Sequence, residues 1–213
     1  MRLMLHDRCS QMPWDAIDNV VFDVGNVLLA YQPETLLRRI LPDNEANYPA
    51  LRRFVFGSPY WHMMDHGIVS PEEAFMLMGA GHPSLRPLFQ RIYENWNDLL
   101  DPIPEGIEAL KACRAHGKRC YVLSNYADAP FEHSFRKHPD IFSNFDGIVV
   151  SAREHLLKPG HDIFRCLIDR YRLNPERTLF IDDSSANVEA AMACGLQAVH
   201  YDAPGVLAKF MKP

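Results

Sequence analysis

The sequence predicts an α/β protein with a Rossmann-like parallel sheet as its core and a helical cap inserted after the first strand. Two observations predict this fold class. From residue 102 onward short apolar runs alternate with helical patterns, which is typical of βαβ units and a parallel sheet. Between residues 31 and 101, directly after an apolar strand, only helices and loops are indicated. The expected domains are an N-terminal extension at 1–18, a Rossmann-like core at 19–30 and 102–213, and a cap at 31–101.

The expected strands of the core are short and almost wholly apolar, as strands buried on both faces of a sheet are. Gly25-Asn26 ends the first of them, since both residues tolerate unusual backbone angles. Gly117 and Gly195 favour helix ends at their positions. The expected strands are 19–24, 119–123, 147–150, 178–181 and 197–201. The expected helices between them are 104–116, 161–171 and 187–194.

The expected cap carries its own helix signals. Ser70-Pro71-Glu72-Glu73 combines an N-cap residue, a proline at the first helical position and acids in the first turn. Residues 85–100 place apolar side chains at helical spacing on one face. Tyr93 and Trp96 on that face are expected to pack in the core of the cap.

Composition and charge argue against several classes of function. The 213 residues are 47% hydrophobic and 23% charged, which is ordinary for a globular protein. A net charge of −5 gives no electrostatic basis for partnership with nucleic acid or an anionic membrane. No apolar run approaches the roughly 18 residues that span a bilayer, and residues 1–18 lack the apolar stretch of a signal peptide. Five scattered cysteines without CxxC pairs fit reduced thiols and a cytoplasmic location.

Acidic side chains follow two of the expected strands. Asp23 ends one apolar run, and Asp182 with Asp183 ends another. The carboxyl ends of parallel strands are where open α/β sheets bind ligands, so three carboxylates would converge if the two strands are neighbours. Like charges at such distances repel unless a cation neutralises them, and oxygen ligands of this type suit Mg²⁺. The sequence therefore predicts metal-assisted chemistry on an anionic substrate.

Four segments at strand ends resemble, in order and spacing, the motifs of the haloacid dehalogenase superfamily. They are an aspartate after an apolar strand (Val20-Val21-Phe22-Asp23), a serine ending the next core strand (Ser124), a lysine followed by proline (Lys158-Pro159) and an acidic motif after another strand (Ile181-Asp182-Asp183-Ser184). The resemblance covers residue 18 to about 201, and the helical insert between the first two motifs resembles the small helical cap of that family.

The resemblance implies a metal site and a nucleophile. Asp23 would be the nucleophile and would form an aspartyl-phosphate intermediate. Mg²⁺ would be held by Asp23, Asp183 and the backbone carbonyl of Gly25, where it would neutralise phosphate charge. Asp182 belongs to the same expected metal set, and either Asp182 or Asn187 would orient the groups around the metal.

The resemblance also implies a phosphate site beside the nucleophile. Ser124 and the backbone amide of Asn125 would hold phosphate oxygens. Lys158 would pair with both the nucleophile and the phosphate, since its ammonium is a compact countercharge. The expected substrate is a small phosphorylated metabolite, and the expected activity is phosphomonoester hydrolysis by a monomer or a homodimer.

The chain departs from the usual phosphatase pattern at Gly25. Most phosphatases of this superfamily carry there a second aspartate, which serves as general acid and base, a role worth roughly 10²–10⁴-fold in rate. A branch with the form Asp-x-Gly-Asn-Val lacks it, and members that resemble this chain include bacterial sugar-1-phosphate phosphatases. We therefore expect substrates with acidic leaving groups, such as sugar 1-phosphates, or a substitute proton donor from the cap. Trp61-His62 and Asp65-His66 lie there, and His62 and His66 are the candidates.

Two other functions remain open on the sequence. A 2-haloacid dehalogenase uses the same nucleophile without metal and also lacks the second aspartate. The pair Asp182 and Asp183 argues against it, as does Phe164, which stands where those enzymes tend to carry tyrosine. A non-catalytic protein that binds a phosphorylated ligand is supported only by Gly25, because Asp23 and the other charged groups are intact.

Overall fold

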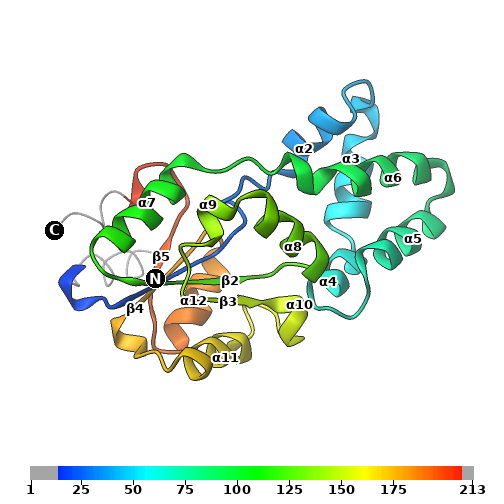
Figure 1. Ribbon diagram of the computed structural model, residues 1–213. Coiled ribbons are helices and arrows are strands. Elements are labelled where there is room, and N and C mark those ends of the chain that lie inside the picture. Colours follow the sequence, from blue (N-terminus) through cyan, green and yellow to red (C-terminus); the bar gives the residue numbers. More distant parts are fainter. Residues whose placement is uncertain (1–13, 208–213) are drawn as a thin grey trace, which may run out of the picture.

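The computed structural model describes residues 14–207 and shows a five-stranded parallel sheet in the order β3-β2-β1-β4-β5 (Figure 1). The strands are β1 (Asn19–Phe22), β2 (Arg119–Ser124), β3 (Gly147–Val150), β4 (Thr178–Asp182) and β5 (Gln197–His200). Helices lie on both faces of this sheet, and a helical segment is inserted between β1 and β2. The expected α/β fold with a parallel sheet core is therefore confirmed.

The register of the sheet brings the ends of three strands together. Phe22 at the end of β1 pairs with Val122 of β2 on one side and with Ile181 of β4 on the other. The backbone N–H of Asp23 continues the ladder by donating to the Ile181 carbonyl at 2.9 Å. Residues that follow these strands therefore lie side by side at the carboxyl edge of the sheet, as expected for a central first strand.

Two apolar layers hold the core helices on the sheet. One layer joins alternate β1 residues to α7 (Pro104–Ala115), α8 (Asp128–Lys137) and α9 (Pro139–Phe142). The other joins the opposite face to α11 (His161–Tyr171) and α12 (Ser185–Ala193). Every residue of β1 is buried, which explains why Asn19 is followed only by the apolar residues Val20, Val21 and Phe22 in that strand. The short α10 (Ser151–Glu154) directly follows β3.

The inserted segment, residues 33–99, consists of helices and turns and lies beside α8 and α10 at one end of the molecule (Figure 1). The capping box expected at the start of α5 is confirmed, because Ser70 Oγ accepts from the Glu73 N–H at 3.1 Å and Glu73 Oε2 accepts from the Ser70 N–H at 2.8 Å. A π-helical turn at Arg52–Phe56 was not foreseen. The helices of the inserted segment are α2 (Pro33–Ile40), α3 (Tyr48–Leu51), α4 (Pro59–Asp65), α5 (Pro71–Gly81) and α6 (Arg86–Asn95). Short turns of 3-10 helix lie at Glu45–Asn47, Pro83–Leu85 and Trp96–Leu99.

Several boundaries differ from the expected ones for local reasons. The strand expected over 19–24 ends at Phe22, because the chain turns at once so that the N–H groups of Leu28 and Leu29 both donate to the Val24 carbonyl. The helix expected over 187–194 begins two residues earlier, at Ser185, with Ser184 as the N-cap residue between it and the acidic pair. The helix expected over 85–100 is α-helical only to Asn95, and the segment Trp96–Leu99 that follows is 3-10 helix. The three helices α8, α9 and α10 were not predicted from the sequence.

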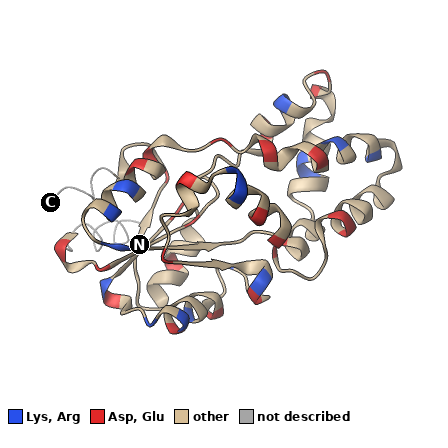
Figure 2. Ribbon diagram, in the orientation of Figure 1, with Lys and Arg blue, Asp and Glu red and all other residues tan. Residues whose placement is uncertain are grey.

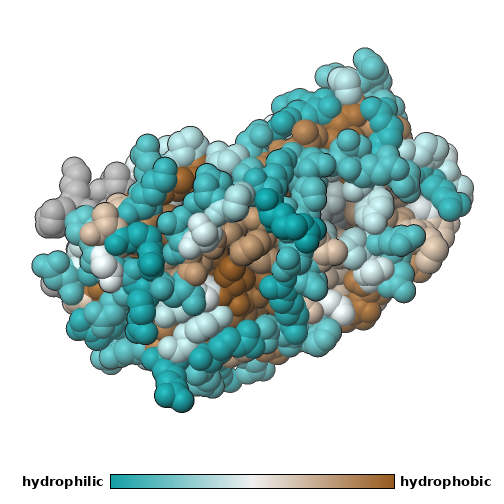
Figure 3. Space-filling view, in the orientation of Figure 1, coloured by the Kyte–Doolittle hydropathy of each residue, from teal (hydrophilic) through white to brown (hydrophobic). Residues whose placement is uncertain are grey.

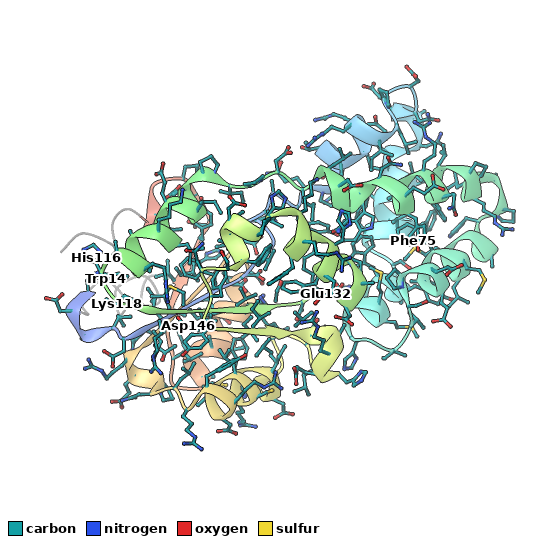
Figure 4. The ribbon with its side chains drawn as sticks, viewed as in Figure 1. Trp14, Phe75, His116, Lys118, Glu132 and Asp146 are labelled. Atoms are coloured by element: carbon teal, nitrogen blue, oxygen red, sulfur yellow. The ribbon has the colours of Figure 1, made fainter. Side chains whose placement is uncertain are left out.

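Residues that precede the first strand pack on the core where the structure describes them. Trp14 is buried, its ring meets His116 edge to face at 6.3 Å, and the Lys118 ammonium lies 5.1 Å from the ring centre (Figure 4). Lys118 also donates to the Trp14 and Ile17 carbonyls. The remainder of the expected extension, including Cys9, lies outside the described residues.

The surface carries charges of both signs over the core and the insert alike (Figure 2). In the view of Figure 3, apolar surface is interrupted by polar side chains. Among residues 14–207, no helix combines the length and the apolar character that a membrane crossing requires.

Candidate active site

The four sequence motifs meet at the carboxyl edge of the sheet. Asp23 follows β1, Ser124 is the last residue of β2, and Asp182 is the last residue of β4. Lys158 comes from the loop between α10 and α11 and reaches the same point. Asp23, Ser124, Lys158 and Asp182 are all buried. The structure thus brings together the residues that the sequence singled out.

Lys158 is the centre of a buried network of charges. Its Nζ lies 2.9 Å from Asp23 Oδ1 and 2.6 Å from Asp182 Oδ2, and it donates to the Leu123 carbonyl at 2.9 Å. Burial alone would lower the pKa of this lysine, but Asp23 and Asp182 raise it above its usual value, so the ammonium stays charged. A fixed positive charge therefore stands beside the carboxylate of Asp23.

Asn125 fixes the loop that carries this lysine. Its Nδ2 donates to the Lys158 carbonyl at 2.9 Å, and its Oδ1 accepts from the Lys158 N–H at 2.8 Å. The side chain of Asn125 thus has a structural function that the sequence did not indicate.

The carboxylate of Asp182 is almost fully occupied by hydrogen bonds. Oδ1 accepts from the Ser184 N–H at 2.8 Å and from Asn187 Nδ2 at 2.9 Å, and Oδ2 accepts from Lys158 at 2.6 Å. The residue is wholly buried. This geometry favours a function in holding Lys158 over direct ligation of a metal.

Asp183 follows Asp182 in the chain and is only partly buried. Asn26 Nδ2 donates to Asp183 Oδ2 at 2.9 Å, and Asn26 Oδ1 accepts from the Tyr31 N–H at 2.9 Å. Asn26 has a left-handed backbone (φ 54°), which asparagine tolerates better than most residues. Asn26 therefore both shapes the turn after Asp23 and orients Asp183.

The acidic cluster has the chemistry of a site for a hard cation. One carboxylate oxygen from each of Asp23, Asp182 and Asp183 lies within 4.8 Å of the others. Burial raises the pKa of Asp23 to about 7. The charges of Asp182 and Asp183 act in the same direction, and Lys158 opposes them. Burial also raises the pKa of Asp183. A divalent cation would remove this repulsion, and an all-oxygen set suits Mg²⁺.

A cavity of about 340 Å³ opens beside Asp23 and is shared between the core and the insert. The core contributes the groups around the nucleophile, and the insert contributes mainly aromatic side chains. The lining residues are Asp23, Val24, Gly25, Asn26, Leu29, Tyr31, Phe56, Trp61, His62, Asp65, Trp96, Leu100, Ser124, Asn125, Tyr126 and Asp183.

Gly25 leaves open the space that a second aspartate would fill. A Cβ placed on Gly25 would meet one atom within 4 Å, the Cβ of Tyr31 at 3.9 Å, and the backbone there has no positive φ. The missing acid is therefore not the result of crowding around this position.

The two histidines expected as substitute acids are placed differently. His62 lines the cavity and is exposed. The ring of His66 instead contacts the backbone carbonyl of His155 at 2.7 Å and does not line the cavity. The structure thus retains His62 as a candidate and gives His66 a place in the contact between α4 and α10.

Asp65, which precedes His66 in the insert, is a cavity residue that was not singled out as a proton donor from the sequence. Burial raises the pKa of its carboxyl group to about 7, and the charge of Asp23 acts in the same direction. Hydrogen bonds from the Ala127 N–H and from Trp61 oppose this rise in pKa. Its backbone carbonyl accepts from Ser151 Oγ at 2.5 Å. The available signal was its spacing of four residues from Trp61, which places both on one face of α4.

The chain matches the model of the haloacid dehalogenase-like hydrolases over residues 17–195. This match covers most of its length, so the protein belongs to that family, and the expected family is confirmed. Its similarity to two curated proteins extends over 84% of the chain. One is the sesquiterpene phosphatase AstK of Aspergillus oryzae, with 25% identity and 87% of that protein covered. The other is the fructose-1-phosphate phosphatase YqaB of Escherichia coli, with 21% identity and 94% covered.

Solved structures show the same fold. A haloacid dehalogenase family enzyme of Bacteroides thetaiotaomicron superposes with a TM-score of 0.72 at 20% identity, over 92% of this chain and 99% of the other. The same enzyme has been crystallised with magnesium and inorganic phosphate, and that structure superposes with a TM-score of 0.65.

Proposed function

We propose that this protein is a Mg²⁺-dependent phosphomonoester hydrolase that acts through an aspartyl-phosphate on Asp23. The observation that carries the proposal is the position of the Lys158 ammonium, 2.9 Å from Asp23 and 2.6 Å from Asp182, beside a cluster of three carboxylates. Two curated relatives that match most of the chain are named phosphatases, which supports the same activity. We also propose that residues 31–101 act as a cap over the core.

In the proposed reaction, a carboxylate oxygen of Asp23 attacks phosphorus and the bond from phosphorus to the leaving-group oxygen breaks. Ser124 Oγ and the Asn125 N–H bind phosphate oxygens, and Lys158 neutralises charge on both the nucleophile and the phosphate. Water then attacks the phosphorus of the acyl phosphate, which releases inorganic phosphate and regenerates Asp23. We propose Asp23, Asp183 and the Gly25 carbonyl as the Mg²⁺ ligands, and Mg²⁺, when bound, supplies charge neutralisation that lets one anion attack another.

We propose Asp65 as the group that moves the proton in both steps. A carboxyl group whose pKa is about 7 is about half protonated at neutral pH, and its protonated form can give the proton to the leaving-group oxygen. The resulting carboxylate can then accept a proton from the attacking water. Asp65 lines the same cavity as Asp23 and comes from the insert, so it can take the place of the side chain that Gly25 lacks.

A 2-haloacid dehalogenase is less well supported by this cavity. Such an enzyme must bind the carboxylate of its substrate, and none of the cavity residues in the described part of the chain is lysine or arginine. Phe164, at the position where those enzymes tend to carry tyrosine, is buried in the core against Phe180, with ring centres 5.3 Å apart.

The test is hydrolysis of p-nitrophenyl phosphate and of a panel of metabolite phosphates, with and without Mg²⁺, by the wild-type protein and the Asp23→Asn variant. We expect Mg²⁺-dependent release of phosphate by the wild type and none above background by the variant. Activity on 2-haloacids in metal-free buffer, with none on phosphate esters, would favour the dehalogenase.

A further inference from the structure

We infer that the alcohol released by this enzyme is uncharged and mainly apolar, such as a branched hydrocarbon or a ring-bearing alcohol. The inference deepens the proposed phosphomonoesterase and rests on it. It concerns the part of the cavity beyond the nucleophile, which we call the leaving-group wall and define as Leu29, Tyr31, Phe56, Trp61, His62, Asp65, Trp96, Leu100 and Tyr126.

Aromatic rings form a continuous surface on this wall. Phe56 and Trp61 have ring centres 5.1 Å apart, and Trp61 lies at the same distance from Trp96. Tyr31 lies 6.0–6.4 Å from all three of them, and Trp96 is 6.2 Å from Tyr126. The rings hold one another in place, so an apolar ligand would meet a surface that is already formed and needs little ordering.

The wall comes from segments far apart in the sequence. Phe56 ends the π-helical turn, Trp61 lies in α4, Trp96 starts a 3-10 turn after α6, and Tyr126 follows β2 in the core. Each is largely buried, with between 3% and 9% of its surface exposed. Phe56, Trp61, Trp96 and Tyr126 therefore pack in the apolar core and line the cavity at the same time.

Few polar groups on the wall are free to meet a polyhydroxylated substrate. The Tyr126 hydroxyl is already 2.7 Å from Asn97 Oδ1 and 2.9 Å from Ser134 Oγ. The polar groups that remain are the Tyr31 hydroxyl, the Trp96 indole N–H, His62 and Asp65. Asp65 is the proposed proton donor to the leaving-group oxygen. A sugar has more hydroxyl groups than these partners can satisfy, and each hydroxyl buried without a partner should lower kcat/KM by about tenfold.

The wall also lacks a partner for a second anionic group. No lysine or arginine lines the cavity among residues 14–207, and Lys158 is committed to Asp23 and Asp182. A carboxylate or second phosphate on the leaving group would be desolvated next to Asp65. The expected leaving group is therefore neutral as well as apolar.

Three synthetic esters isolate this property, because they share the same bond to phosphorus and the same six-carbon spacer. They are heptyl phosphate, 6-hydroxyhexyl phosphate and 6-carboxyhexyl phosphate, which end in methyl, hydroxyl and carboxylate groups. We expect kcat/KM to fall in that order, with at least about a tenfold preference for the methyl over the hydroxyl end, as one unpaired hydroxyl predicts.

A pair of variants in one turn provides the control. Phe56→Gln places an amide on the wall, whereas Phe54→Gln alters a neighbouring side chain that stacks on His82 and does not line the cavity. Phe56→Gln should narrow the preference for heptyl over hydroxyhexyl phosphate, and Phe54→Gln should leave it unchanged. Thermal unfolding of both variants checks that each is folded. If Phe56→Gln does not fold, the order of kcat/KM for the three esters with the wild-type protein still tests the inference.

The outcomes separate the two proposals. Hydrolysis of p-nitrophenyl phosphate that depends on Asp23, together with equal or better use of the hydroxyl or carboxylate ester, would overturn the apolar leaving group and leave the phosphatase intact. An absence of turnover for every phosphate ester would overturn the proposed function and this inference with it.

Discussion

Replacing Asp65 by asparagine removes a proton from the cavity with little change of shape. If Asp65 protonates the leaving oxygen, the loss should be large for esters of poorly acidic alcohols and small for p-nitrophenyl phosphate, whose leaving group needs no proton. General acid catalysis is worth roughly 10²–10⁴-fold, which is about 2.7–5.5 kcal/mol of transition-state stabilisation. We therefore expect alkyl phosphate hydrolysis to fall by about that factor in Asp65→Asn.

The assay is the rate of the chemical step for phosphate esters that differ in leaving-group pKa, measured in single turnover so that product release does not interfere. Wild type should give a shallow dependence and Asp65→Asn a steep negative one. His62→Asn, which changes the other cavity candidate, should resemble wild type. A steep dependence in His62→Asn with a shallow one in Asp65→Asn would assign the acid to His62 instead.

Gly25 supplies a rescue experiment. A side chain at Gly25 would meet only the Cβ of Tyr31, at 3.9 Å, so Gly25→Asp is expected to fit. In the double variant Gly25→Asp with Asp65→Asn, the shallow dependence should return, at least in part. An unchanged leaving-group dependence in Asp65→Asn itself would show that Asp65 does not protonate the leaving oxygen.

Further predictions concern the metal, the buried lysine and pH. EDTA should abolish phosphate release and Mg²⁺ should restore it, whereas retained activity in metal-free buffer would contradict the assigned cofactor. Asp182→Asn removes a charged partner of Lys158, so it should lower kcat and destabilise the fold by about 1.5–3 kcal/mol. The Mg²⁺ affinity should change little. A loss of Mg²⁺ affinity as large as that of Asp183→Asn would instead make Asp182 a metal ligand. The pKa of Asp65 is raised from 3.8 to about 7, so the stability contributed by its neutral form is complete below pH 3.8 and is lost as pH rises to 7. Asp65→Asn should accordingly be more stable than wild type by about 2–4 kcal/mol at pH 8 and nearly equal at pH 4 in urea unfolding.

The sequence predicted the core well where local pattern and burial agree. The strand over 147–150 and the helix over 161–171 match the structure, because each is bounded by clear breaks. Asp23, Ser124 and Asp182 could be placed together because parallel strands share one edge. The helices between residues 128 and 154 were missed, since their capping and packing depend on contacts with the insert and the sheet.

The leaving-group wall could not be predicted in the same way. Trp96 was expected in the core of the cap, and it is buried there, but its place on the cavity depends on its contact with Tyr126, which follows β2 in the core. Asp65 was passed over in favour of histidines because its raised pKa results from burial and from the nearby charge of Asp23. Both properties arise from the tertiary structure, which aligns α4 with the carboxyl edge of the sheet.

The most direct test of the account is chemical trapping of the phosphorylated nucleophile. Wild type and Asp65→Asn are mixed with p-nitrophenyl phosphate and Mg²⁺, quenched in acid over a time course and reduced with borohydride, which converts an aspartyl-phosphate to homoserine. Peptide mass mapping should then find homoserine at position 23, with more in Asp65→Asn because the second step lacks its base, and none in Asp23→Asn. Turnover without homoserine at position 23 in either protein, or homoserine at another aspartate, would contradict the central claim.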